Sequence, residues 1–277
     1  MTSQIVDRIL ALPPHEQKAA VEHFRRLVET RRAKLPPKHL APIELARRAG
    51  IEPDPWQCSV LDSRASRILL NCSRQSGKST ITALLAVHTA YYSAGSLVLL
   101  LSPSLRQSGE LFKKAIEIHR AVGTTLRVEA ESALRLELGN GSRIVSLPGK
   151  EQSIRGFSGV NLLAVDEAAR VSDELYLSIR PMLAVSGGRL MALSTPFGTR
   201  GWWYEAWRST EDWHRFEIPA TECPRISPAF LQEERQAMGE WWFAQEYMCQ
   251  FLDAETQPFS REDVENAFKE DVEPWDL

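Results

Sequence analysis

The sequence predicts an α/β fold with a central, mostly parallel sheet that is flanked by helices. Short apolar runs alternate with longer amphipathic stretches between residues 67 and 193, which is the rhythm of βαβ units. The later strand candidates are apolar throughout rather than alternating, as expected for strands that are buried on both faces. Composition agrees with a packed core, because 43% hydrophobic and 25% charged residues are ordinary values for a globular chain of 277 residues.

Composition and spacing also exclude several classes of protein. The longest apolar run, residues 97–101, is far shorter than the roughly 18 residues that a membrane span needs. The first residues lack the basic and apolar regions of a signal peptide. The 4 cysteines form no C-x-x-C pair, and the 6 histidines show no metal-ligand spacing with them. We therefore expect a protein of a reducing cytosol that has neither a zinc site nor a disulfide framework.

Residues 1–50 are predicted to form a helical N-terminal appendage. Apolar residues recur at helical spacing between positions 20 and 28, and a short helix over 43–49 should end at Gly50. This segment carries 10 Lys and Arg against 5 Asp and Glu, whereas residues 251–277 carry 2 against 9. Most charge runs of this kind are solvated helix faces, although a basic front end could also touch nucleic acid.

The main core is expected to span residues 51–225, and a helical C-terminal subdomain to span 226–277. Strands are predicted over 67–71, 96–101, 162–165 and 189–193, and helices over 78–92 and 106–122. Three further strands, 125–129, 134–138 and 143–147, read as an antiparallel insertion, because G-N-G-S at 139–142 suits a tight turn.

Residues 72–79, C-S-R-Q-S-G-K-S, match the phosphate-binding loop G-x-x-x-x-G-K-[ST] everywhere except at the first position. This segment follows a predicted strand and opens a predicted helix. Backbone N–H groups would cradle phosphate oxygens there, Lys78 would reach the terminal phosphates and the Ser79 hydroxyl would bind Mg²⁺. We expect nucleotide contacts from all of the loop residues: Cys72, Ser73, Arg74, Gln75, Ser76, Gly77, Lys78, Ser79 and Thr80.

Two carboxylates, Asp166 and Glu167, end the apolar strand predicted at 162–165. Asp166 could hold the Mg²⁺ shell through water, and Glu167 could orient or deprotonate an attacking water. In isolation such a pair would more often mark an exposed helix start. The phosphate-binding loop upstream favours the catalytic interpretation.

Three smaller features gain weight from the loop and the carboxylates. Gln57, about 20 residues before the loop, could read an adenine edge with a donor and an acceptor. Ser194 and Thr195 end the next predicted strand, where their hydroxyls could sense a γ-phosphate. Arg155 precedes the carboxylate strand, where a guanidinium could complete the site of a neighbouring subunit. Taken singly, Gln57 also fits an ordinary surface glutamine, and Ser194 with Thr195 fits a simple turn equally well. For Arg155 alone, an ordinary surface charge is the favoured interpretation.

In this order, W-Q, S-R-Q-S-G-K-S, L-L-A-V-D-E-A-A and L-S-T-P-F-G resemble the ATPase domain of the terminase large subunit, the DNA-packaging motor of tailed phages. The resemblance runs from about residue 54 to residue 251. Its most specific element is the Arg-Gln pair inside the loop, since terminases also tolerate a non-glycine first position. The resemblance implies a P-loop NTPase of the additional-strand (ASCE) type that uses Mg²⁺ to hydrolyse ATP.

The resemblance also implies roles for individual residues. Gln57 matches the adenine-recognition glutamine of the family. Arg74 and Lys78 match the basic residues of its phosphate loop. Ser79 and Asp166 match its metal ligands.

Further roles follow from the same resemblance. Glu167 matches the catalytic glutamate, and Ser194 with Thr195 matches the motif that couples hydrolysis to movement. Arg155 lies in a segment where some terminases place an arginine finger that acts on the adjacent subunit.

As a terminase motor, the chain would translocate double-stranded DNA without sequence preference and would act with a portal protein and a terminase small subunit. It would form a homo-oligomeric ring when assembled and be a monomer in isolation, without a membrane partner. We expect it in the cytoplasm of the host bacterium, transiently at the procapsid portal. Terminase large subunits usually continue into an RNase H-like nuclease, and no nuclease activity is expected from the 277 residues of this chain.

Two alternatives remain open at the level of the sequence. A helicase-like DNA-dependent ATPase shares the glutamine, the phosphate loop, the D-E pair and the S-T pair. A nucleotide-gated assembly module would use ATP only to order a ring, without catalysis.

Overall fold

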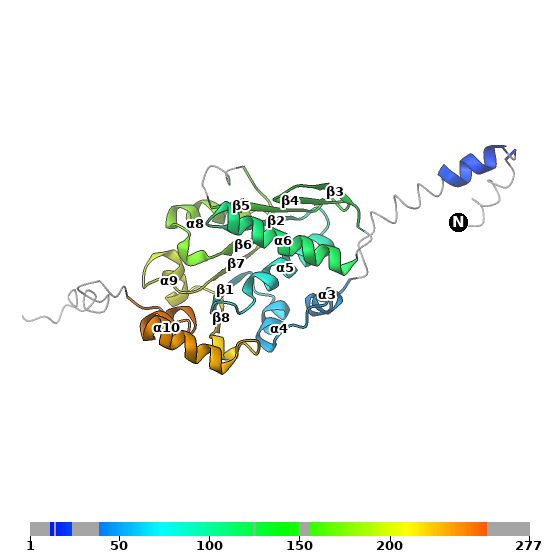
Figure 1. The fold of residues 1–277 in the computed structure, drawn as a ribbon. Coiled ribbons are helices and arrows are strands. Elements are labelled where there is room, and N and C mark those ends of the chain that lie inside the picture. Colours follow the sequence, from blue (N-terminus) through cyan, green and yellow to red (C-terminus); the bar gives the residue numbers. More distant parts are fainter. Residues whose placement is uncertain are drawn as a thin grey trace, which may run out of the picture.

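The fold is built around a twisted sheet with helices on both faces (Figure 1). The computed structural model describes residues 12–13, 15–23, 39–123, 126–149, 154 and 156–253. Within these residues, an eight-stranded sheet has the strand order β3-β4-β5-β2-β6-β7-β1-β8. Neighbours are parallel from β5 to β8 and antiparallel between β3, β4 and β5. The predicted α/β class with a mostly parallel sheet is confirmed.

The strands follow the predicted apolar runs within one or two residues, except at the start of the first inserted strand. They are β1 Arg67–Cys72, β2 Leu97–Ser102, β3 Val128–Glu131, β4 Arg135–Leu138, β5 Arg143–Pro148, β6 Val160–Asp166, β7 Arg189–Ser194 and β8 His214–Ile218. We did not predict β8. It lies at one edge of the sheet and its sequence, H-R-F-E-I, alternates in polarity, so it lacks the continuous apolar run that marks the inner strands.

The longer helices agree closely with the sequence analysis. The described helices are α3 Pro42–Arg48, α4 Pro55–Asp62, α5 Lys78–Tyr92, α6 Leu105–Val122, α8 Asp173–Ile179, α9 Gly201–Arg208 and α10 Pro228–Glu246, with 3-10 turns η1 Ala168–Arg170, η2 Arg180–Leu183 and η3 Ala220–Glu222. Residues 15–23 are also helical. The predicted bounds of α5 are correct at both ends. We did not predict α8 and α9, which are only 7 and 8 residues long.

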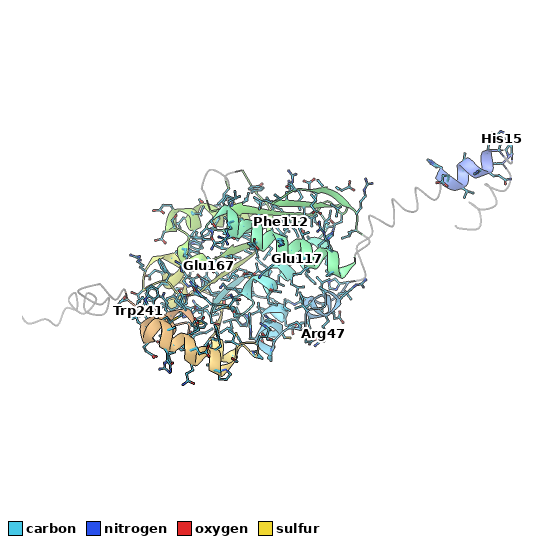
Figure 2. All side chains as sticks on the ribbon, in the orientation of Figure 1. His15, Arg47, Phe112, Glu117, Glu167 and Trp241 are labelled. Carbon is cyan, nitrogen blue, oxygen red and sulfur yellow. The ribbon has the colours of Figure 1, made fainter. Side chains whose placement is uncertain are left out.

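The two faces of the sheet bury separate hydrophobic clusters. Ile68 and Leu70 of β1 pack in a cluster with α5 and α6, and Leu69 packs in a second cluster with α8 and α9. Phe112 of α6, labelled in Figure 2, belongs to the first cluster. Successive side chains of a strand point to opposite faces, so a strand with helices on both sides must be apolar at every position.

The order of the central strands identifies the type of sheet. Strand β7 lies between β1 and β6 and pairs in parallel with both. The strand that leads into the phosphate loop is therefore separated from the strand that ends in the two carboxylates. This inserted strand is the feature that gives the additional-strand P-loop class its name, and it confirms the predicted fold class.

Strands β3 to β5 form antiparallel hairpins, as predicted. They do not form a separate sheet, because β5 also pairs in parallel with β2 over residues 143–148. Gly141, with a φ of 83°, lies in the turn between β4 and β5. The hairpins thus extend the main sheet at the edge opposite β8.

The flanking helices also contact the core. Leu45 and Ala46 of α3 are fully buried in the cluster that holds α5. The last of the described helices, α10, is kinked at Gly239 and covers a small cluster that includes Leu231, Phe243 and Tyr247. Among the described helices, none combines the length and apolar content needed to cross a bilayer.

Candidate active site

The phosphate loop connects β1 to α5 and is held by several backbone contacts. The N–H of Ser73 donates to the carbonyl of Ile218 at 2.9 Å, and the N–H of Arg74 donates to the carbonyl of Glu246 at 3.0 Å. Within the loop, the Ser76 hydroxyl donates to the carbonyl of Ser73 at 3.0 Å. Contacts from β8 and from the end of α10 thus fix the loop, which leaves its far side facing the pocket.

Gly77 is required at the point where the loop becomes a helix. Its φ is 96°, in the left-handed region that glycine adopts at little cost. A β-carbon at this position would lie 2.8 Å from Nε2 of Gln57 and 3.1 Å from Nη2 of Arg225. The first N–H groups of α5 then begin at Lys78, at a helix end that favours an anion.

A pocket of about 640 Å³ lies beside this helix end. It is lined by Arg74, Gln75, Gly77, Lys78, Ser79, Thr80, Gln107, Lys114, Glu167, Arg170 and Thr195. The pocket therefore brings together six of the nine predicted loop residues, Glu167 and Thr195. Ser76 and Asp166, which were also predicted, are buried and do not line it. Four of the lining side chains are cationic and one is anionic, so the pocket favours a strongly negative ligand.

Three lining residues were not predicted. Gln107 and Lys114 come from α6, and Arg170 comes from η1, directly after the carboxylates. In the sequence, Gln107 and Lys114 look like the polar face of an amphipathic helix, and no local signal marks them. Arg170 could have been singled out by its place three residues after Glu167.

Glu167 lies between two cations. Its Oε1 is 3.4 Å from Nζ of Lys78, and its Oε2 is 3.7 Å from Nε of Arg170. The residue has φ 50° and ψ 44°, a left-handed conformation that costs about 1–3 kcal/mol for a residue other than glycine. Figure 2 shows Glu167 in the middle of the fold, at the end of β6. The backbone at this position aims the carboxylate at the pocket.

Asp166 is buried beside it, with 7% of its surface exposed. Burial raises the pKa of Asp166 to about 6, against the opposing effect of Lys78. Its Oδ1 accepts the N–H of Glu167 at 3.0 Å. At neutral pH the carboxylate is therefore ionised in most molecules and can act as a metal ligand.

The donors present suit Mg²⁺. Ser79 and Asp166 supply a hydroxyl and a carboxylate, the hard oxygen donors that Mg²⁺ prefers together with water and phosphate. Within the part of the chain that the structure describes, no group of three or more His, Cys, Asp or Glu side chains forms a metal site by itself. A metal here would need phosphate oxygens and water to complete its coordination.

Gln57 lies behind the loop and is 3% exposed. Its Oε1 accepts the N–H of Asp54 at 2.9 Å and so caps α4, while its Nε2 lies against Gly77. Arg225 joins the same region, because it donates to Asp54 Oδ1 at 2.5 Å and to the carbonyl of Ser76 at 2.8 Å. Gln57 does not line the 640 Å³ pocket.

Arg74 makes two contacts with the end of α10. Besides the backbone hydrogen bond, its Nε lies 2.5 Å from Oε2 of Glu246, whose side chain is 8% exposed. Arg74 also lines the pocket. Its guanidinium therefore connects the phosphate loop to the C-terminal helix.

The remaining predicted residues divide between the pocket and its support. Ser194 is buried and accepts the N–H of Ala169 at 3.2 Å, whereas Thr195 lines the pocket. Cys72 and Ser73 are buried and do not line the pocket. Burial raises the pKa of the Cys72 thiol to about 12, so this side chain is an uncharged packing group. Arg155 lies outside the described residues.

Sequence comparison identifies relatives for most of the chain. The family described as "Terminase large subunit, T4likevirus-type, N-terminal" matches residues 69–266. The terminase large subunits of Thermus phage G20c and Thermus virus P23-45 are each 25% identical over 252 residues, which cover 78% of this chain and 52% of each relative. The chain thus spans about half the length of these curated relatives.

Solved structures share the fold. The ATPase domain of the Thermus phage P74-26 large terminase has a TM-score of 0.69 at 22% identity, covering 79% of this chain and 100% of that one. The large terminase of another thermophilic bacteriophage, in complex with ADP, has a TM-score of 0.63 at 13% identity, covering 72% and 54%. The fold, the arrangement of the pocket and the family match over residues 69–266 lead to one assignment: the chain belongs to the terminase large subunit family, matching its T4-like N-terminal region.

Proposed function

We propose that this chain is the ATP-hydrolysing motor of a viral DNA-packaging terminase, which couples hydrolysis to the translocation of double-stranded DNA into a procapsid. One observation carries the proposal: the phosphate loop, Glu167 and Thr195 meet in a pocket with four cationic side chains. A nucleotide polyphosphate is the ligand that such a helix end and charge would favour. The large terminase of the second thermophilic phage has been solved with ADP and with ATP-γ-S, which supports the same class of ligand.

In this proposal the phosphates bind at the start of α5. Lys78 contacts the terminal phosphates, and backbone N–H groups of residues 75–80 bind the oxygens between them. Ser79 and Asp166 hold Mg²⁺, which supplies charge neutralisation on the phosphates when it is bound. Arg74 adds a positive charge from the loop. Because it also pairs with Glu246, it transmits the presence of the nucleotide to the end of α10.

Hydrolysis would depend on Glu167. Its carboxylate orients the attacking water and accepts its proton, which is the task that a left-handed residue aimed into the pocket can perform. Gln57, packed against Gly77, contributes to adenine recognition through its Nε2 group, because its Oε1 already caps α4.

The remaining assignments concern coupling. Thr195 senses the terminal phosphate, and Ser194 transmits the change through its contact with Ala169. Arg155 acts as a finger on a neighbouring subunit. An arginine finger is worth roughly 10³ to 10⁵ in rate in related NTPases, so a monomer that lacks its neighbour would be slow.

We propose three regions: a helical appendage over 1–50, an ATPase core over 51–225 and a helical C-terminal subdomain over 226–277. The partners would be double-stranded DNA, a portal protein and a terminase small subunit, with other copies of this chain in a ring. DNA contacts would be mainly to phosphates, so affinity should fall steeply as salt rises. The place of action would be the host cytoplasm, at the procapsid portal.

The test is Mg²⁺-dependent ATP hydrolysis measured over a wide range of protein concentration, with the Glu167→Gln variant as the blank. Specific activity that rises with concentration supports a site completed between subunits. A specific activity that is above the blank but independent of protein concentration would place all the catalytic residues within one chain. This result would favour a helicase-like ATPase, which a strand-unwinding assay would detect. A rate equal to the blank at every concentration would contradict the proposal and leave the non-catalytic module.

A further inference from the structure

Arg170 contacts both the proposed catalytic carboxylate and the loop that follows β7. Its Nε lies 3.7 Å from Oε2 of Glu167, and its guanidinium carbon lies 4.3 Å from the ring centroid of Phe197. We propose that Arg170 is a positioning residue that holds Glu167 in place for hydrolysis and connects it to Phe197. This inference rests on the proposed ATPase function.

The first step of the argument is that Glu167 shares its charge between two cations, Lys78 and Arg170. Lys78 is also the residue that would bind the terminal phosphates. A phosphate at Lys78 repels the carboxylate and takes over part of the ammonium charge. Arg170 is then the cation that remains with Glu167 and keeps its carboxylate aimed at the water.

The second step concerns the opposite side of the guanidinium. Arg170 is the last residue of η1, a 3-10 turn of only three residues. The N–H of Ala169 donates to Ser194 Oγ at the end of β7, and Arg170 contacts the Phe197 ring in the loop that follows. A shift of the Glu167 carboxylate would therefore displace residues 194–197 through these contacts.

The third step is the choice of residue. A planar guanidinium can present its face to an aromatic ring and its N–H edge to a carboxylate at the same time. A lysine at this position could satisfy one of these partners but not both. Arg170→Lys therefore keeps the positive charge and tests whether the planar shape of the guanidinium is needed.

A simpler role would be direct contact of Arg170 with the nucleotide, since Arg170 lines the pocket. The two roles differ in their dependence on Glu167. If Arg170 acts through Glu167, then in its absence the Glu167 carboxylate pairs only with Lys78. Lys78 then binds phosphate less well, because the carboxylate competes with the phosphate for its ammonium group. In the Glu167→Gln background this competition is absent, and removing Arg170 should have no effect on binding.

The experiment uses the full chain. We would measure kcat and KM for ATP, and the Kd for ATP-γ-S in the presence of Mg²⁺, for wild type, Arg170→Ala, Arg170→Lys, Phe197→Leu and the Arg170→Ala/Phe197→Leu double variant. The same Kd is then measured for Glu167→Gln with and without Arg170→Ala. Arg208→Ala is the matched control, because Arg208 is exposed and its guanidinium lies 5.6 Å from the Tyr204 ring, with neither residue lining the pocket.

The proposal predicts that Arg170→Ala lowers kcat by about tenfold or more and raises the Kd by about two- to fivefold. Arg170→Lys should recover binding but only part of kcat. Phe197→Leu should lower kcat by about two- to fivefold, and the double variant should resemble Arg170→Ala alone, as expected for residues that act as a unit. Arg208→Ala should match the wild type.

Two results would overturn the proposal. One is a Kd that rises equally with Arg170→Ala in the Glu167→Gln background, which would make Arg170 a direct nucleotide ligand. The other is a kcat within about twofold of wild type for Arg170→Ala. If wild type shows no hydrolysis above Glu167→Gln, the proposed function fails, and the binding cycle with ATP-γ-S still decides whether Arg170 acts through Glu167.

Discussion

Lys78 and Glu167 face each other in the pocket, with Nζ of the lysine 3.4 Å from a carboxylate oxygen of the glutamate. Replacing Glu167 with Gln removes the proposed base and also releases Lys78 from a competing charge. We expect kcat for ATP to fall by about 100-fold or more while ATP-γ-S binds at least as tightly as to wild type. Hydrolysis near the wild-type rate would disprove the assignment of Glu167 as the catalytic glutamate.

The raised pKa of Asp166 predicts a pH dependence of stability. Its pKa is about 6 in the folded protein against 3.8 for the unfolded group, so the folded state holds the extra proton between these values. Stability that is present below pH 3.8 is therefore lost as the pH rises through 6, and the loss is about 3 kcal/mol. Asp166→Asn should thus raise the free energy of unfolding at pH 8 and change it little at pH 4.

Urea titrations at both pH values, followed by circular dichroism, would measure this difference. In the proposed function the same carboxyl would also set the acidic limit of metal binding, because a protonated Asp166 is a poor Mg²⁺ ligand. We expect Mg²⁺-dependent hydrolysis to decline as the pH falls through about 6. A variant that gains as much stability at pH 4 as at pH 8 would mean that the effect of Asp166→Asn is not due to ionisation.

Arg225 pairs with Asp54 and also donates to the phosphate-loop carbonyl of Ser76. Arg225→Ala would leave a carboxylate that is only 9% exposed without its cation, and Oδ2 of Asp54 has no hydrogen-bond partner within the described residues. Arg225 itself is half exposed, so we expect a loss of about 1–2 kcal/mol of unfolding free energy rather than the larger value of a fully buried pair.

Nucleotide affinity should fall with the same substitution, because the loop loses a support beside Gly77. Thermal unfolding and ATP-γ-S titration would measure the two effects. Arg47→Ala, which breaks the exposed pair of Arg47 with Glu52, is the matched control and should change neither. Unchanged affinity in Arg225→Ala would show that the loop keeps its shape without Arg225.

Gly188 lies just before β7 in very tight packing. A β-carbon there would lie 2.0 Å from the carbonyl oxygen of Val160 and 3.0 Å from backbone atoms of Asn161, so Gly188→Ala must displace the start of β6 or β7. We expect a loss of about 3 kcal/mol or more in unfolding free energy. Gly109→Ala in α6, where a β-carbon meets nothing within 4 Å, should be neutral or stabilise by about 0.5–1 kcal/mol. Equal stabilities for the two variants in urea would refute this packing argument.

Much of the fold could be predicted because its signals are local. α5 is bounded by a glycine at its start and by the loss of the apolar pattern after Tyr92, and both of its ends were predicted correctly. The inner strands are recognisable because burial on both faces requires an uninterrupted apolar run. β8 could not be found in this way, since it is an edge strand with half-buried residues.

The candidate site shows the same limit. The phosphate loop and the Asp-Glu pair are each continuous segments of sequence, and residues of the loop and Glu167 line the same pocket, whereas Asp166 is buried beside it. Arg225 is 149 residues away from Ser76 along the chain and 171 away from Asp54, so nothing local distinguishes it from a surface charge. Lys114 enters the pocket only because α6 packs beside α5, which is a property of tertiary structure.

Because β7 lies between β1 and β6, the strands that lead into the two halves of the pocket are not paired with one another in the described sheet. The separation of Lys78 from Glu167 is maintained by the hydrogen bonds of β7 to both of its neighbouring strands. The amides of β7 should therefore be among the slowest in the molecule to exchange with deuterium. Because this inner strand should open only together with the rest of the sheet, local opening of the edge strands should leave the width of the pocket unchanged. The distance between the two sides of the pocket thus depends on six residues, Arg189–Ser194.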